Sequence, residues 1–146
     1  MNRLPDWSRQ YVRDSLAPPE LVWAEWADVA TWPAWNAGVV AIELEGPFRT
    51  GTWFTMRLPD GTVLRSQLLE VEAPRRFVDE TACGDTRIRV DHRVAPLPQG
   101  GCRITLEVAA DGPEAAAIGE GASADFPEVL AALAQRAERA HRSGAR

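Results

Sequence analysis

The segment FVDETACGDTRIRVDHRV, residues 77–94, decides how the rest of the chain is interpreted. Gly84-Asp85 is a two-residue turn signal, and side chains alternate in character on both sides of it. We therefore predict an antiparallel hairpin of strands 77–83 and 86–94. A turn of two residues sets the cross-strand pairs Cys83–Thr86, Thr81–Ile88, Asp79–Val90 and Phe77–His92.

The second half of this hairpin separates its side chains onto two faces. Arg87, Arg89, Asp91 and Arg93 alternate with an apolar set. A face with three arginines belongs in water, because unpaired buried charges are costly. The other face therefore points inward, and it carries Ile88, Val90, His92 and Val94, with Asp79 on the partner strand.

Further stretches with a period of two extend the hairpin into a sheet. Strands are expected at 7–13, 39–45, 52–58, 62–71 and 102–108, in addition to the hairpin. Short connections make consecutive strands antiparallel. Taking Asp60-Gly61 as a second two-residue turn places Phe54 and Met56 inward, opposite Gln67 and Arg65, whereas a slip of one residue would expose both polar side chains.

Helices are expected after the first strand and after the last strand of this sheet. Pro18 and Pro19 can begin a helix that runs to Ala27, and Asp28 can cap a second short helix, which Trp32, Pro33 and Trp35 interrupt. Residues 114–121 are ambiguous, because an alanine run is interrupted by two glycines. A long amphipathic helix is expected from Ser123 or Asp125 to Arg142, with the apolar stripe Phe126, Val129, Leu130, Leu133 and Ala137.

The predicted fold is thus α+β, a curved antiparallel sheet of about seven strands wrapped around a long C-terminal helix. One helix is narrower than such a sheet, so a space remains between them that side chains fill or a ligand occupies. The chain of 146 residues has the size of one domain, 1–146, and an average apolar content of 45%.

Composition excludes several classes of function. The net charge of −5 argues against nucleic-acid binding, and no apolar run is long enough to span a membrane. The first six residues lack the apolar stretch of a secretory signal, so we expect a cytoplasmic protein.

All 16 basic residues are arginine, which excludes lysine Schiff-base chemistry and a P-loop. The two cysteines and two histidines lack metal-ligand spacing. We therefore expect no metal and no cofactor. Cys83 and Cys102 lie on strands separated by a third, too far apart for a disulfide, and are expected to be reduced.

The chain resembles the START-like helix-grip superfamily (SRPBCC type), named for polyketide cyclases and dehydrases and for lipid transport. The matching residues are Ala17-Pro18-Pro19-Glu20-Leu21-Val22-Trp23, Asp28, Trp32-Pro33-Ala34-Trp35-Asn36, Gly46-Pro47-Phe48 with Gly51, Glu70–Phe77 and the closing helix. The resemblance implies a fold, and a function among ligand binders, cyclases and proteins related to co-chaperones.

The candidate site combines polar groups with an apolar pocket. His92 and Asp79 are the candidate catalytic pair, with His92 as acid or base and Asp79 orienting it. Arg65 could hold a carboxylate or enolate oxygen. The candidate ligand-binding residues are Arg65, Gln67, Trp32, Trp53, Phe54, Met56, Val90, Phe126, Leu130 and Leu133. Alternatively, Arg65 and Asp79 form an ion pair and His92 is part of the wall.

The tryptophans have two candidate roles, packing and lining the cavity. Four of them, Trp23, Trp26, Trp32 and Trp35, fall within thirteen residues. Trp23 and Trp35 are expected to pack the short helices on the sheet. Trp26, Trp32 and Trp53 are candidates for a cavity mouth, with the short helices and loop 46–51 forming the entrance.

Three functions are consistent with these observations. The first is binding of a small apolar or aromatic ligand, lipid-like or polyketide-like, between sheet and helix. The second is a polyketide cyclase or dehydratase reaction at His92. The third is a co-chaperone-like interaction module, which predicts an exposed apolar patch. The sequence leaves monomer and homodimer open.

Overall fold

The computed structural model describes residues 3–144, so two residues at each end of the expected domain lie outside it. One seven-stranded sheet has the order β1-β7-β6-β5-β4-β3-β2, and every neighbouring pair is antiparallel. Its strands are β1 (Trp7–Ser15), β2 (Ala41–Leu44), β3 (Trp53–Arg57), β4 (Val63–Glu72), β5 (Arg76–Cys83), β6 (Thr86–Pro96) and β7 (Cys102–Asp111).

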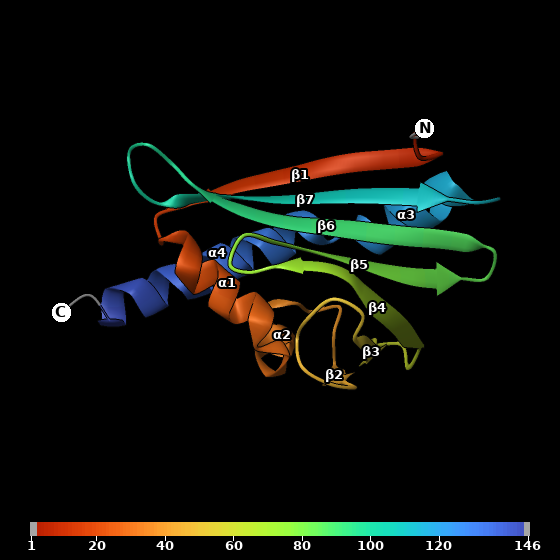
Figure 1. Cartoon of the computed structure of the whole chain (residues 1–146), viewed down its shortest axis with the longest axis horizontal. Helices are drawn as coiled ribbons and strands as arrows, with labels where there is room; N and C mark the ends of the chain where they lie inside the picture. The colour runs from red at the N-terminus through yellow and green to blue at the C-terminus, as the bar shows by residue number, and fades with distance from the viewer. Residues whose placement is uncertain (1–2, 145–146) are drawn as a thin grey trace.

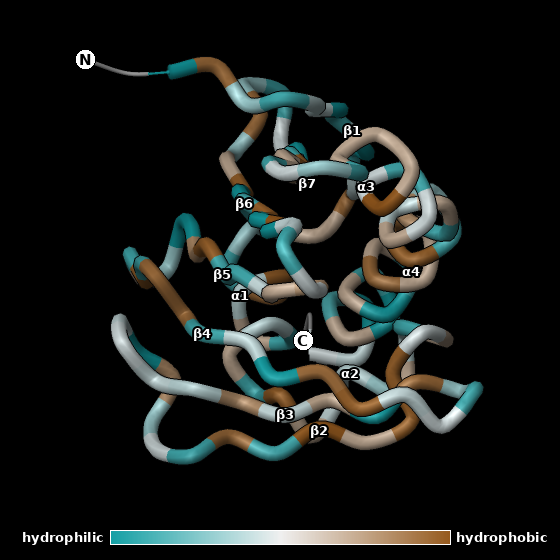
Figure 2. The backbone as a smooth tube through the Cα atoms, turned by 90° about the vertical axis from the view of Figure 1, so that its right-hand side faces the viewer, coloured by the Kyte–Doolittle hydropathy of each residue, from teal (hydrophilic) through white to brown (hydrophobic). Residues whose placement is uncertain are grey.

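The helices occupy the two predicted regions of the chain. Between β1 and β2 lie α1 (Pro19–Ala27), a 3-10 turn (Val29–Thr31) and α2 (Trp32–Trp35). After β7 come α3 (Ala115–Ser123) and the long α4 (Phe126–Gly144). The sheet curves around α3 and α4, as Figures 1 and 2 show from two directions. The helix-grip architecture predicted from the sequence is confirmed.

The ambiguous segment 114–121 is helical for a packing reason. A side chain at Gly119 would collide with the ring of Trp7 on β1. The glycine that weakens α3 as an isolated helix therefore lets this helix lie directly on the sheet. Trp7 and Ile118 pack in a cluster with Ile88 and Val108, which closes this end of the interior.

The 77–94 hairpin forms with the predicted register. Phe77 lies opposite His92 and Asp79 opposite Val90, and Gly84 takes the positive φ of 62° that its tight turn requires. The outer face is charged, as predicted. Arg76 contacts Asp91 (3.1 Å), Glu70 and Glu72 (2.9 Å each) there.

The neighbouring hairpin differs from its prediction by one residue. The turn at Asp60-Gly61 holds three residues, since Leu58 N–H donates to the carbonyl of Thr62 (2.8 Å). Pro59 begins this turn, where its fixed φ is suitable and its missing N–H is not needed. Phe54 consequently lies opposite Ser66, with Ser66 facing inward in place of Gln67.

That shift moves two candidate ligand-binding residues, Arg65 and Gln67, to the outer face. Arg65 pairs there with Glu45 (2.9 Å) and lies over the ring of Trp53 at 4.2 Å. Gln67 lies opposite Trp53. The predicted inward orientation of Arg65 and Gln67 is therefore wrong, and so is the alternative ion pair between Arg65 and Asp79. Trp53, a candidate for the cavity mouth, lies on the same outer face and does not line the cavity.

Polar contacts join the C-terminal half of α4 to α1 and to the end of β1. Arg136 pairs with Glu25 of α1 at 2.6 Å. Glu138 accepts hydrogen bonds from the hydroxyl of Ser15 (2.9 Å) and the backbone N–H of Leu16 (3.0 Å) at the end of β1. The Glu138 contacts join α4 to the edge strand β1, and the Arg136 contact joins it to α1.

Candidate functional site

Aromatic rings fill one end of the interior. Phe77 on β5 is fully buried and contacts Trp26, Trp32 and Phe48, with ring centroids 5.5, 6.1 and 5.1 Å apart. Phe48 comes from the loop after β2 and also meets Trp23 (6.1 Å). The loop 46–51 therefore closes this end, where an entrance was expected.

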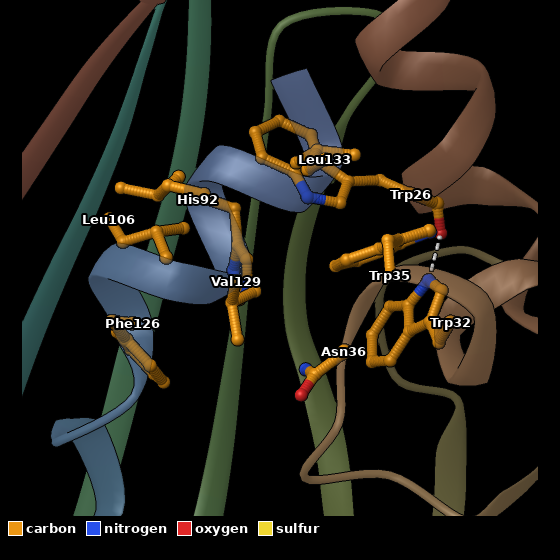
Figure 3. A pocket seen from close by; sticks show the side chains of 10 residues that line it. Trp26, Trp32, Trp35, Asn36, His92, Leu106, Phe126, Val129 and Leu133 are labelled. Atoms are coloured by element: carbon orange, nitrogen blue, oxygen red, sulfur yellow. Dashed lines mark hydrogen bonds between the residues drawn. The ribbon is translucent and has the colours of Figure 1, made fainter. Parts of the chain in front are cut away.

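A small cavity lies beside this aromatic cluster, between α2, α4 and the sheet. Its volume is about 40 Å³, and most of the space predicted between sheet and helix is filled by side chains. Figure 3 shows Trp26, Trp32, Trp35 and Asn36 on one side, facing His92, Leu106, Phe126 and Val129 on the other. Leu130 and Leu133 of α4 complete the wall.

Two of the three indole N–H groups of the wall have local hydrogen-bond partners. Trp32 Nε1 donates to the carbonyl of Trp26 (3.0 Å), and Trp35 Nε1 donates to the hydroxyl of Thr31 (3.1 Å). These bonds engage both N–H groups within the protein, so the Trp32 and Trp35 rings offer mainly apolar surface to a ligand. Ring faces of this kind suit an apolar or planar molecule.

His92 is the titratable group in the cavity wall. Its ring is stacked on Phe77, and its Nδ1 lies 3.2 Å from the carbonyl oxygen of the same residue. A carbonyl only accepts, so Nδ1 carries the proton and Nε2 is an acceptor. Burial lowers the pKa of His92 to about 4, which keeps the imidazole neutral near pH 7.

Asp79 shares the inner face but does not hydrogen-bond His92. Its side chain is 8% exposed, and burial raises the pKa of its carboxyl to about 7. The expectation that Asp79 orients His92 is therefore wrong, because the backbone carbonyl of Phe77 holds the ring instead. The role of His92 as an acid or base stays a prediction.

The family model described as polyketide cyclase / dehydrase and lipid transport matches residues 7–138. The chain belongs to this family. The polyketide cyclase / dehydrase and lipid transport family was also the resemblance expected from the APPELVW and WPAWN segments. No curated protein sequence matches the chain.

Solved structures share the fold at low sequence identity. Protein MLL2253 from Mesorhizobium loti is 20% identical, with a TM-score of 0.77 over 91% of this chain and 98% of that one. The hypothetical protein jhp0584 from Helicobacter pylori is 16% identical, with a TM-score of 0.74 over 94% and 97%. Truncated norcoclaurine synthase from Thalictrum flavum is 14% identical, with 0.69 over 92% and 96%.

The predicted ligand-binding residues fall into three groups in this family member. Trp32, Phe126, Leu130 and Leu133 line the cavity with His92. Phe54, Met56 and Val90 lie inside the fold but outside the cavity wall. Trp53, Arg65 and Gln67 lie on the outer face, as described above.

Sequence reasoning missed part of the wall. Trp35 was expected to serve packing, and it is buried, but it also lines the cavity. Asn36 was not considered, although it follows the last residue of α2 and so ends at the cavity. In the described range 3–144, neither a cluster of three or more potential metal ligands nor a helix apolar and long enough to cross a membrane occurs.

Proposed function

We propose that this protein binds a small apolar or aromatic molecule between the inner face of the sheet and α4. The observation that carries the proposal is the cavity wall, in which aromatic rings and leucines surround two polar groups, His92 and Asn36. Apolar walls with a few placed polar groups are typical of small-molecule sites. Lipid transport and polyketide chemistry, the two themes of the family description, both involve such molecules.

Binding requires the cavity to grow. A volume of 40 Å³ accommodates little more than water, whereas an apolar cavity that takes benzene measures about 150 Å³. The ligand therefore displaces side chains, and the half-buried Phe126 at the start of α4 is the wall residue placed to move.

We propose that the ligand enters between α2 and the start of α4. A side chain at Gly38 would approach the carboxylate of Asp125 to 3.3 Å, so the two segments touch here. Asn36 Oδ1 accepts from the N–H of Gly38 (2.9 Å), which is a bond within the loop and not across this junction. The opposite end is closed by Phe48 and Phe77.

Isothermal titration with naphthalene-1-methanol tests the proposal. We expect saturable binding to the wild-type protein and at least a tenfold weaker affinity in Val129→Trp, which fills the cavity. Val63→Trp makes the same substitution at an exposed site and should bind as wild type. Thermal unfolding of both variants checks that they fold.

Absence of binding to the wild-type protein would overturn the proposal, and so would equal binding to folded Val129→Trp. Leu133→Ala gives an independent check, because it enlarges the same cavity. The affinity of Leu133→Ala for naphthalene-1-methanol should rise rather than fall.

A further inference from the structure

Asp79 is an acidic group without a partner on the inner wall. Its side chain projects from β5 on the same face as Phe77 and is 8% exposed. Within residues 3–144 no hydrogen bond or ion pair reaches its carboxyl, and burial alone accounts for its raised pKa. No fully occluded side-chain oxygen in that range lacks a hydrogen bond, so the carboxyl oxygens keep some access to open space.

Neighbouring polar groups are already engaged with one another. The hydroxyls of Ser66 and Thr81, beside Asp79 in the sheet, are 2.6 Å apart and bond to each other. Arg87 and Arg89, on the next strand, pair with Glu80 on the outer face. The fold thus supplies Asp79 with neither a hydrogen-bond donor nor a cation.

Asp79 also lies close to the cavity. It is diagonal to His92 across β5 and β6, a relationship that separates residues by about 7–8 Å. Val90, directly opposite Asp79, packs in the same cluster as Phe126 of the cavity wall. A ligand that enlarges the cavity past Phe126 would extend toward Val90 and the Asp79 carboxyl opposite it.

We propose that Asp79 receives the ammonium group of a ligand whose apolar or aromatic body occupies the cavity. The proposal rests on the ligand-binding function above and names its chemical class, a primary amine on an apolar body. A buried carboxylate is stabilised by a cation and repels an anion. His92 Nε2, an acceptor, also favours donors over carboxylate ligands.

Such binding has a signature in proton release. The pKa of Asp79 is about 7, so its carboxyl is mostly protonated at pH 6. An ammonium group that pairs with it favours the ionised form, and the proton leaves to solvent. At pH 8 the carboxylate is already ionised, and release should nearly vanish.

The test compares three probes with one ring system: 1-naphthylmethylamine, naphthalene-1-methanol and naphthalene-1-carboxylate. Calorimetric titrations at pH 8 should rank them in this order, with the amine about tenfold or more tighter than the alcohol. At pH 6, titrations in two buffers of different ionisation enthalpy should show release approaching one proton per bound amine.

Asp79→Asn should lose both the preference for the amine over the alcohol and the proton release. Asp85→Asn removes the same charge in the exposed turn of that hairpin and should keep both. Alcohol binding without an amine preference, or a preference retained in Asp79→Asn, overturns this inference alone. Failure of all three probes overturns the ligand-binding function and this inference with it.

Discussion

Phe77 contacts His92 in two ways at once. The two rings are stacked with centroids 3.8 Å apart, and the Phe77 carbonyl oxygen lies 3.2 Å from His92 Nδ1. The two residues are directly opposite each other in the β5–β6 pair, so the hairpin register produces both contacts. Phe77 therefore fixes the orientation and the tautomer of the histidine, and shares its burial with Trp26.

The first prediction concerns the protonation of His92. Nitrogen-15 NMR of the imidazole should show the Nδ1–H tautomer at pH 7, with the ring still neutral at pH 5.5, because burial lowers the pKa to about 4. A His141→Asn variant assigns the signals. An Nε2–H tautomer, or a ring protonated at pH 6, would contradict the account of this contact.

The second prediction concerns Asp79 and the free energy of unfolding. Burial raises its pKa from 3.8 to about 7, so between these values the folded state binds more protons than the unfolded state. Its contribution to stability is thus present below pH 3.8 and lost as pH rises through 7. In urea titrations, the free energy of unfolding of Asp79→Asn should rise relative to that of wild type over this pH range, by up to about 4 kcal/mol.

Asp85→Asn is the control for that series, since its side chain is exposed. The difference in free energy of unfolding between wild type and Asp85→Asn should stay nearly constant from pH 4 to pH 8. A flat difference for Asp79→Asn as well would show that the carboxyl is solvated rather than buried.

The third prediction concerns packing around the cavity. Leu133 is 1% exposed, so Leu133→Ala should destabilise the fold by about 2–5 kcal/mol while enlarging the cavity. Leu16→Ala, at a residue that is 79% exposed, should change stability by less than about 0.5 kcal/mol. Similar losses in the two variants, measured by urea unfolding, would mean that α4 does not seal the interior.

The fourth prediction concerns the outer face. Arg65 is half exposed and paired with Glu45, so Arg65→Ala should cost no more than about 1 kcal/mol of stability. Its affinity for naphthalene-1-methanol should equal that of wild type, because the side chain points away from the cavity. A tenfold loss of affinity would contradict this placement and support the inward orientation of Arg65 expected from the sequence.

The contrast between the two hairpins shows what the sequence could predict. Gly84-Asp85 closes a two-residue turn, and the whole 77–94 register follows from it. Asp60-Gly61 has the same appearance, but Pro59 joins the turn and shifts the register by one residue. Because side chains alternate along a strand, that single residue moves Arg65 from the inside to the outside.

The cavity wall was harder to predict than the fold. Periodicity places Leu133 and His92 on inner faces, but it does not give the distance between those faces. That distance depends on contacts such as Glu138–Ser15, which join α4 and β1 across 123 positions of the chain. The sequence therefore predicts an interior space without its volume.

The most direct test of the central claim follows the tryptophan indole N–H signals during titration with naphthalene-1-methanol. The account predicts saturable shifts at Trp26, Trp32 and Trp35, which line the cavity, and none at Trp53 on the outer face. Shifts confined to Trp53, or no saturable shift at the three cavity tryptophans, would contradict binding between the sheet and α4.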